Sequence, residues 1–423
     1  MLLLGVLLTV GGVAQAQRVP RPDALPPAPI EVGAKAPLMA TTLDEMQGWD
    51  RYPTFDVYVQ MMRGYAERYP SLCALDTVGF SVQGRPLLAL RLTGVDTAEG
   101  QRPEFLYASS IHGDELTGYV MLLRLADTLL SSYGREAGVT ALLDGTIVYV
   151  MPLLNPDGAY REDNASLARA RRYNADGEDL NRSYPDPFHP LAKSVPQENA
   201  VMMDFASRHH FTVSATLHGG AEVMNYPWDS FTSEEQAHPA TPWWHAVCAH
   251  LVQTARRARA TAFSDVNDSG IIAGGDWYVI DGGRQDYLNY YHQCRELTME
   301  ISTTKLPEAT QLPRHWRTLG AMLVEYIKAA DTTRTPAWVA VKEVAGEGFR
   351  LFPNPATDHV CCEGLEPGAR LLLTDLQGRV LLTATAVDGT ARMAVDALPA
   401  GAYLLRVELP SGAAEGRVIM VKR

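Results

Sequence analysis

The chain contains few cysteines and fewer basic than acidic residues. Each of these shortages excludes a class of protein. Only five cysteines occur in 423 residues, at irregular intervals and with no Cys-x-x-Cys pair. Neither a disulfide scaffold nor a cysteine-based structural zinc site is therefore expected. Lysine and arginine number 37 against 49 acidic residues, and the net charge is −12. With no basic field over the whole chain, we expect no nucleic acid partner and no attraction to anionic lipid.

Long apolar runs are also missing, apart from one at the N-terminus. Residues 2–13 are apolar but too few to cross a bilayer, so no transmembrane segment is expected. The run ends in Ala-Gln-Ala-Gln at residues 14–17, the small-x-small pattern of a signal-peptidase site. We interpret residues 1–16 as a cleaved secretory signal, although no Lys or Arg precedes the run; a buried N-terminal helix or strand is the alternative. The prolines that follow predict an extended linker over residues 17–43.

The pattern of apolar residues indicates a large α/β domain over residues 44–332. Helical and strand patterns alternate there, which predicts a three-layer α/β fold. Thr54 is a plausible N-cap for a first helix whose apolar face carries Val57, Met61 and Tyr65. Ligands of such sheets collect beyond the carboxyl ends of strands. Buried strands are expected at residues 105–109, 146–151, 212–216 and 297–301, and further helices at 116–130, 196–208, 242–257 and 314–329.

The C-terminal part of the chain has a different pattern. After a linker at residues 333–348, residues 349–423 consist of short alternating segments separated by glycine-containing turns. This pattern predicts a small all-β sandwich. A carbohydrate-binding or stabilising sandwich is one interpretation, but few aromatic side chains are available for stacking on sugars. The expected strands are residues 371–374, 379–385, 392–395, 402–408 and 416–421.

Two histidines and a glutamate lie at predicted carboxyl ends of strands. His112 and Glu115 follow one strand directly, and His218 follows another. Two imidazoles and one carboxylate suit a catalytic Zn²⁺, which takes three protein ligands and keeps a fourth position open. The His-x-x-Glu spacing alone is a weak signal, because this composition produces such pairs by chance.

Polar residues elsewhere strengthen the zinc hypothesis. Arg172, Asn181 and Arg182 provide positive charge and an amide in a turn-rich region, and an arginine fork matches a carboxylate. An ordinary solvated loop is the alternative for these three. Glu300 lies within a predicted core strand, where an acid is costly unless it faces a site. A buried salt bridge, for example with Arg295, is the alternative for Glu300.

These motifs occur in the order found in one enzyme family. From about residue 49 to 330 the chain resembles the zinc metallocarboxypeptidases, most closely the branch with carboxypeptidases N, E and D. The resemblance implies a mixed eight-stranded sheet between helices. The matching motifs are His-x-x-Glu at 112–115, Asn-Pro-Asp-Gly at 155–158, Asp-Leu-Asn-Arg at 179–182, Leu-His-Gly-Gly at 217–220, Asn-Tyr-Pro-x-Asp at 225–229, Gly-Gly-x-Gln-Asp at 282–286 and Glu-x-Thr-x-Glu-x-Ser at 296–302.

The resemblance implies a role for each matching residue. It makes one Zn²⁺ per catalytic domain the cofactor, Glu300 the general base and Arg172 the group that stabilises the carbonyl oxygen. A clamp of three residues would hold the free C-terminal carboxylate of the substrate. The tyrosine of this clamp is chosen by its distance in sequence from Glu300. Asp229 would bind a basic side chain of the substrate. The implied zinc ligands are His112, Glu115 and His218, and the implied clamp is Asn181, Arg182 and Tyr278.

The C-terminal sandwich carries a second resemblance. It is similar to the sorting domains of proteins exported by the type IX secretion system, through Phe-Pro-Asn-Pro-Ala at 352–356, Asp-Leu-Gln-Gly-Arg at 375–379 and Leu-Pro-Ala-Gly-Ala-Tyr at 398–403. The N, E and D branch normally carries a transthyretin-like domain at this place, so that domain is absent or is replaced by the sorting-type module. Ser183 and Asp281 also depart from the branch pattern, without touching a proposed catalytic role.

Together these features predict a secreted or surface-attached enzyme, exported through the periplasm, that removes C-terminal Lys or Arg from peptides and proteins. We expect a monomer whose other partner is the secretion machinery. A zinc amidase acting on cell-wall peptides, or an acylase of small N-acyl amino acids, is the enzymatic alternative. A non-catalytic secreted binding protein on the same fold is the other alternative, but it predicts the loss of a ligand or of the base, and every such position is filled.

Overall fold

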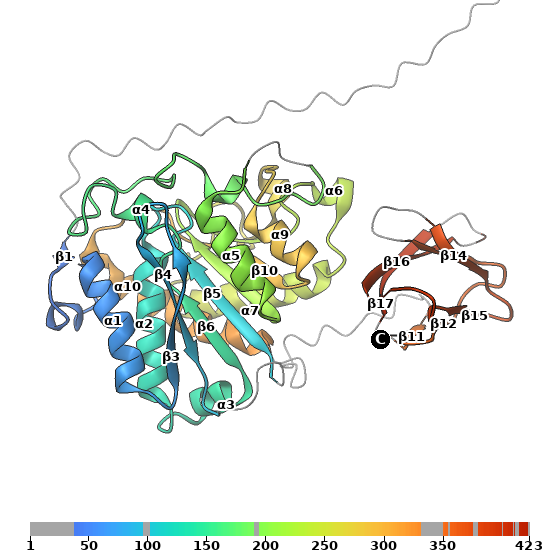
Figure 1. The fold of residues 1–423 in the computed structure, drawn as a ribbon, viewed down its shortest axis with the longest axis horizontal. Coiled ribbons are helices and arrows are strands. Elements are labelled where there is room, and N and C mark those ends of the chain that lie inside the picture. The colour runs from blue at the N-terminus through green and yellow to red at the C-terminus, as the bar shows by residue number, and fades with distance from the viewer. Residues whose placement is uncertain are drawn as a thin grey trace, which may run out of the picture. The chain divides into compact units, whose positions relative to one another are not determined.

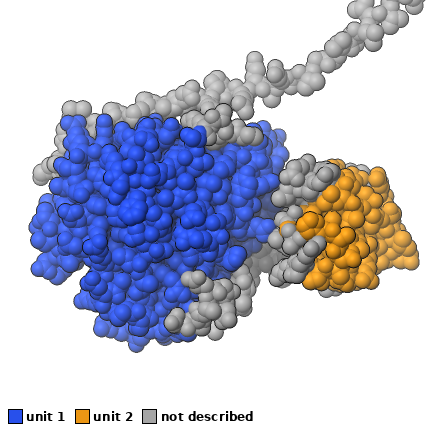
Figure 2. Space-filling view, viewed as in Figure 1, with its two compact units in different colours: residues 1–340 blue, residues 341–423 orange. Residues whose placement is uncertain are grey.

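The chain divides into two compact units, residues 1–340 and 341–423 (Figure 2). In the computed structural model the described residues are 38–95, 102–189, 194–330, 350–353, 356–374, 380–399, 401–408, 410 and 414–421. The predicted signal sequence, most of the N-terminal linker and the linker at 333–348 lie outside them. No helix among the described residues is long and apolar enough to cross a membrane.

A mixed eight-stranded sheet forms the centre of the first unit (Figure 1). Its four middle strands, β6, β5, β7 and β10, run parallel, while β4 and β8 pair antiparallel with this group. Parallel neighbours bring their carboxyl ends to one edge of the sheet, where ligands bind. In spatial order the strands are β3 (Cys73–Phe80), β4 (Pro86–Leu92), β6 (Ile147–Met151), β5 (Glu104–Ser109), β7 (Phe211–His218), β10 (Arg295–Ser302), β8 (Ala221–Tyr226) and β9 (Ile271–Ala273).

Helices cover both faces of this sheet, as the sequence predicted (Figure 1). One face packs against α1 (Phe55–Arg68), α2 (Thr117–Ser132), α7 (Thr241–Ala258) and α10 (Leu312–Ile327). The other packs against α5 (Gln197–Ser207) and α9 (Arg284–Tyr291). Shorter elements of this unit are β1 (Met39–Ala40), β2 (Tyr52–Pro53), α3 (Ala137–Gly145), α4 (Pro156–Ala159), α6 (Ser233–Gln236), α8 (Gly274–Trp277) and the 3-10 helices Asp44–Met46, Leu180–Arg182, Ala309–Gln311 and Lys328–Ala330.

The two middle strands β7 and β10 have one apolar face and one polar face. Val213, Ala215 and Leu217 of β7 point into the core that α2, α7 and α10 cover. Because side chains alternate along a strand, Ser214, Thr216 and His218 point to the opposite face. The same alternation in β10 places its acidic residues on that polar face, beside the β7 residues with which they are in register.

The predicted elements of this unit are present within a few residues of their expected bounds. Thr54 does cap α1, because its side chain accepts a hydrogen bond from the Val57 N–H, and the predicted face of α1 is buried. Strands β3, β4, β8 and β9 were not predicted. The edge strand β3 is half-exposed and β9 has only three residues, so neither carries an apolar run of the length expected for a buried strand.

The second unit contains two antiparallel sheets with a common core. Its four-stranded sheet has the order β14-β13-β16-β17, and its three-stranded sheet the order β11-β12-β15. All five predicted strands are present, and the two unpredicted ones are β11 and β12. Tyr403, counted among the few aromatic candidates for sugar stacking, is buried in this core. The strands are β11 (Arg350–Phe352), β12 (His359–Glu363), β13 (Arg370–Thr374), β14 (Val380–Thr385), β15 (Thr390–Ala394), β16 (Gly401–Glu408) and β17 (Ala414–Val421).

Candidate active site

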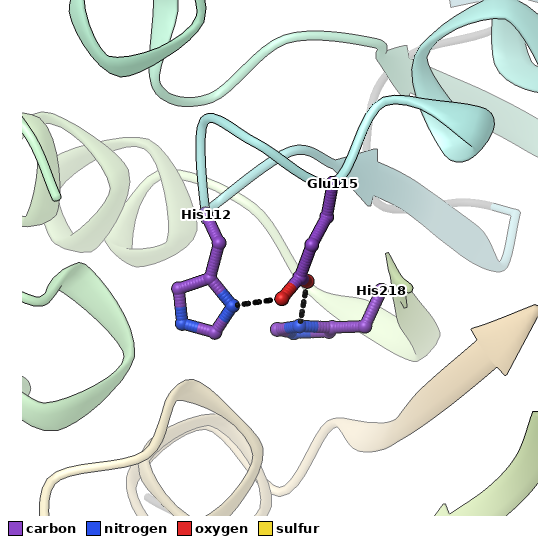
Figure 3. Close-up of side chains that lie close together, drawn as sticks. All are labelled: His112, Glu115 and His218. Carbon is purple, nitrogen blue, oxygen red and sulfur yellow. Dashed lines mark hydrogen bonds and ion pairs between the residues drawn. The ribbon is translucent and has the colours of Figure 1, made fainter. Parts of the chain in front are cut away.

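Three predicted zinc ligands meet at the carboxyl edge of the sheet (Figure 3). His112 and Glu115 lie in the turn that follows β5, and His218 is the last residue of the neighbouring parallel strand β7. The Nδ1 atoms of both histidines lie 2.9 Å from the Glu115 carboxylate, one at each oxygen. One ligand atom from each residue lies within 4.8 Å of the others. This buried set of two imidazoles and a carboxylate fits a tetrahedral zinc centre with one open position.

The turn that carries His112 and Glu115 is held by close backbone packing. A Cβ atom at Gly113 would collide with the backbone of Gly158, so only glycine fits there. The Gly113 N–H donates to the carbonyl of Arg172 at 3.2 Å. Asn155 fastens the same region, because its amide donates to the carbonyls of Ile111 and Arg172, each at 3.2 Å. The Asn-Pro-Asp-Gly motif therefore fixes the conformation of the turn through Asn155 and Gly158.

Asp179 contacts the Nε2 atom of His112 and so orients its ring. Its carboxylate lies 3.3 Å from His112 Nε2 and accepts a hydrogen bond of 2.8 Å from Arg172 Nε. Burial alone would raise the pKa of Asp179, but His112 and Arg172 outweigh it and hold that pKa well below its usual range. A carboxylate behind a histidine ligand fixes the ring and its tautomer. The sequence prediction gave Asp179 no role of its own, although it belongs to a quoted motif.

The protonation states of His218 and Glu115 suit metal binding. Burial lowers the pKa of His218 to about 4, so this imidazole is neutral near neutral pH. Burial would raise the pKa of Glu115, but its contacts with His112 and His218 hold the pKa well below the usual range. A neutral imidazole and an ionised carboxylate are the forms that bind a metal.

Glu300 faces the same centre from β10. It is the residue of β10 in register with His218, and both lie on the polar face of the sheet. Its side chain is buried, and its Oε2 atom has no hydrogen-bond partner among the described residues. Burial and the charge of Glu115 raise its pKa well above the usual value. The alternative salt bridge with Arg295 is absent, since that guanidinium lies over the Trp243 ring, 4.4 Å from its centroid.

Arg172 lies beside the predicted ligands. Its Nη1 atom is 3.2 Å from His112 Nδ1 and 3.8 Å from the Glu115 carboxylate. The Asp179 carboxylate fixes the guanidinium on its other side, and 27% of the side chain is exposed. Arg172 is therefore both anchored and accessible to a ligand.

The three predicted clamp residues converge near this centre. Asn181 is buried, and its Oδ1 atom accepts the Arg284 N–H at 2.9 Å, which leaves its amide nitrogen as the available donor. The Arg182 guanidinium donates to the Asn181 carbonyl at 2.7 Å. Tyr278 is half-exposed, and partial burial together with the charge of Glu300 raises its pKa to about 12. Tyr278 therefore remains a neutral hydroxyl that can donate a hydrogen bond.

Asp229 is a buried carboxylate in contact with the first turn of α9. Its side chain is buried, and its Oδ1 accepts a hydrogen bond of 2.9 Å from Gln285 Nε2. Burial and the neighbouring Asp286 raise the pKa of Asp229 well above the usual value. A Cβ atom at Gly274 would collide with the Asp229 carboxylate, so glycine is required there. The sequence prediction gave Gln285 no role, although it belongs to the quoted Gly-Gly-x-Gln-Asp motif.

Lys305 is a second residue that the prediction missed. It follows β10, and its Nζ atom lies 3.2 Å from the Glu115 carboxylate and 3.4 Å from Asp114. The backbone carbonyl of Lys305 also accepts the Leu116 N–H at 2.8 Å. Lys305 thus fixes the end of the turn that carries Glu115. The quoted motif ends at Ser302, and Lys305 lies just beyond it, so the prediction did not include this residue.

Comparison with known proteins identifies the family of the first unit. The family model described as zinc carboxypeptidase matches residues 58–321, more than half of the chain. The chain belongs to the zinc carboxypeptidase family. Residues 350–421 of this family member match the model described as a secretion system C-terminal sorting domain, which confirms the second predicted resemblance.

Among curated relatives, carboxypeptidase M of Mus musculus is 36% identical over 281 residues, which cover 63% of this chain and 63% of that protein. Carboxypeptidase D of Mus musculus is 29% identical over 289 residues, which cover 66% of this chain and 21% of that protein. The carboxypeptidase N catalytic chain of Rattus norvegicus is 29% identical over 314 residues, covering 66% of this chain and 68% of that protein. The chain therefore spans less than two thirds of carboxypeptidase M and about a fifth of carboxypeptidase D.

Solved structures confirm the predicted fold of this family member. Thrombin activatable fibrinolysis inhibitor has a TM-score of 0.56 at 18% identity, and the match covers 66% of this chain and 75% of that one. Carboxypeptidase A from Helicoverpa armigera has a TM-score of 0.58 at 16% identity, covering 70% and 78%. At such identities the likeness concerns the fold, and the roles assigned above to single residues stay predictions.

Proposed function

We propose that the protein is a zinc-dependent carboxypeptidase that releases the C-terminal residue of peptides. The observation that carries this proposal is the convergence of His112, Glu115 and His218, with Glu300 in register beside His218. When bound, Zn²⁺ supplies Lewis acidity at the scissile carbonyl and makes water a stronger acid. The three residues that would hold it are buried, and the pKa directions of Glu115 and His218 give the forms that metal binding requires.

Glu300 acts as the general base in this proposal. Its raised pKa makes it a stronger base than an exposed glutamate, and its unpartnered Oε2 atom leaves an acceptor for a water proton. After attack on the peptide carbonyl, the same carboxyl group delivers the proton to the leaving amine. Arg172, anchored by Asp179, stabilises the negative charge that develops on the carbonyl oxygen.

The clamp explains why only the terminal peptide bond would be cut. The Asn181 amide, the Arg182 guanidinium and the Tyr278 hydroxyl are three donors suited to a free carboxylate. An internal peptide segment has no charge to pair with Arg182, so it binds poorly. The clamp therefore restricts cleavage to the C-terminal peptide bond of the substrate.

Asp229 would select the residue that is released. A buried carboxylate at the end of a pocket pairs with a guanidinium or ammonium group, and the described contacts of its Oδ1 come from neutral amides only. We therefore propose C-terminal Arg and Lys as the preferred leaving residues.

We also propose that the protein is exported and is then secreted or attached to the cell surface. This rests on the sorting-domain match over residues 350–421, and it makes the secretion machinery the partner of the second unit. The first unit would meet peptide and protein C-termini outside the cell.

One assay series tests the activity and its specificity together. Purified protein is assayed with hippuryl-Arg, hippuryl-Phe and a cell-wall tetrapeptide, with and without a chelator. We expect hippuryl-Arg to be the best substrate, its turnover to stop with the chelator and to return with added Zn²⁺. Chelator-insensitive hydrolysis of hippuryl-Arg would contradict the zinc mechanism. Preference for the tetrapeptide would establish the amidase alternative, and no turnover of any substrate would support a binding protein.

A further inference from the structure

The first turn of α9 contacts both parts of the proposed substrate site. The Arg284 backbone N–H donates to Asn181 Oδ1 at 2.9 Å, which orients the clamp amide. The Gln285 side chain donates to Asp229 Oδ1 at 2.9 Å. The Asp286 carboxylate accepts the backbone N–H of Asp229, also at 2.9 Å. One helical turn therefore sets the positions of a clamp residue and of the specificity acid.

The side chain of Arg284 anchors this turn to the sheet. It is 98% buried and forms an ion pair with Glu296 of β10 and a hydrogen bond with Thr216 of β7. Glu296 is completely buried and also accepts the hydroxyl groups of Ser214 and Thr216. Both oxygens of this carboxylate thus accept hydrogen bonds from residues of β7 or α9.

The two strands that receive this anchor also carry the catalytic centre. Along the polar face, Glu296 is in register with Ser214, and Glu300 is in register with His218. Between these two pairs lies the pair of Thr298 and Thr216. Because a strand is stiff over so few residues, a shift of α9 against these strands moves the clamp relative to the base.

We propose that Arg284 and Glu296 form a positioning pair, which fixes the first turn of α9 and so aligns Asn181 and Asp229 with Glu300 and His218. The proposal rests on the proposed carboxypeptidase function. A buried, hydrogen-bonded ion pair is directional, whereas an apolar contact would let the helix slide. Neither residue belongs to the groups proposed to contact the peptide, so the pair acts through other residues.

A double variant tests this role without leaving an unpaired buried charge. Arg284→Met with Glu296→Gln removes both charges and keeps similar volumes. We expect the KM for hippuryl-Arg to rise about tenfold and kcat to change less than about threefold, because substrate alignment is lost while the zinc ligands and base remain. Zinc content should be unchanged. Hydrogen exchange of the Asp229 and Ser230 amides, which donate to Asp286, should become faster.

The matched control removes a partly buried ion pair on the other face of the sheet. Glu222 of β8 pairs with the Arg259 guanidinium, and neither contacts the site. Glu222→Gln with Arg259→Met should lower the unfolding temperature but leave KM and the exchange of Asp229 unchanged. A general loss of stability therefore cannot imitate the expected result.

Arg284→Lys provides a second variant that retains the charge but replaces the planar guanidinium with an ammonium group. KM should rise less in this variant than in the double variant, and hydrogen exchange of the Asp229 and Ser230 amides should again become faster. This variant replaces the double variant in the test if the double variant does not fold. Unaltered KM and unaltered exchange in the folded variants would refute the positioning role. If the wild-type protein hydrolyses neither hippuryl-Arg nor hippuryl-Phe, the proposed function fails. The exchange comparison alone then decides whether the pair positions Asp229.

Discussion

At the scale of single residues, the proposed site contains two buried acids for which the described residues provide no ion pair. Glu300 and Asp229 are both buried, and burial raises the pKa of each well above its usual value. Such groups cost stability in the folded protein. By contrast, the buried acids Glu296 and Asp157 have arginine partners, and they belong to the scaffold.

The base can be tested by Glu300→Gln. Removing a general base should lower kcat about 10²- to 10⁴-fold, while zinc content stays the same because Glu300 is not a predicted ligand. Replacing an unpaired buried carboxylate with a neutral amide should not lower the unfolding temperature of the zinc-free protein at neutral pH. Assays with hippuryl-Arg, metal analysis and thermal unfolding check these outcomes. A variant with near wild-type kcat would remove Glu300 from the mechanism.

The pH dependence of selectivity tests Asp229. Its raised pKa means that the acid is protonated at low pH and ionises only as the pH rises through that value. Only the ionised form attracts a guanidinium, so the ratio of kcat/KM for hippuryl-Arg to that for hippuryl-Phe should rise with pH. Because both substrates need an ionised Glu300, the ratio cancels the titration of the base.

Asp229→Asn is the control for this pH profile. The variant should retain its zinc, lose about 10- to 100-fold of the preference for Arg, and show a ratio that no longer changes with pH. Unchanged selectivity in this variant would contradict the pocket role of Asp229.

At the scale of elements, close backbone contacts shape the turn between β5 and α2. The added methyl group of Gly113→Ala would collide with the Gly158 backbone and move His112 relative to Glu115. We expect zinc affinity to fall about 10- to 100-fold, with activity following it. Zinc titration of the metal-free protein measures this loss.

Gly64→Ala serves as the control for Gly113→Ala. No atom of another element lies within 4 Å of a Cβ added at this position in α1, so the change should stabilise the protein by about 0.5–1 kcal/mol. Equal zinc affinity in both variants would show that the contact with Gly158 does not control the turn.

The elements that the sequence predicted are those with strong local signals. Helix α1 has a capping threonine and a continuous apolar face, and β5 is buried at every position. Strand β3 was missed because a half-exposed edge strand lacks an apolar run, and α9 because its buried residues include Arg284, Gln285 and Asp286, which are polar. Local periodicity reports burial of apolar side chains and does not report buried polar contacts.

At the scale of the whole molecule, the two units have separate cores. The apolar residues around Leu371 and Val407 pack with one another in the second unit, and the first unit has its own large core. A chain that ends at Ala340 should therefore keep its zinc content and its kcat/KM for hippuryl-Arg within about twofold. In cells, the same truncation should abolish export. Loss of activity in the purified truncated protein would show that the first unit depends on the second.

The sequence alone determined the type of chemistry and the order of the domains. His112, Glu115, His218 and Glu300 could be predicted because each lies in a short motif, and a motif records which functional groups follow one another along the chain. Hydropathy and glycine spacing likewise predicted the α/β unit and the small β unit. These are local properties, which a linear pattern can carry.

Only the tertiary structure decided which groups meet. The contacts of Asp179 with His112, of Lys305 with Glu115, of Gln285 with Asp229 and of Arg284 with Glu296 join different elements, and no spacing along the chain encodes them. The parallel pairing of β5, β7 and β10 brings distant motifs to one edge, and burial at that edge sets the pKa values. Distance and desolvation depend on three-dimensional packing, and so they are properties of the folded chain.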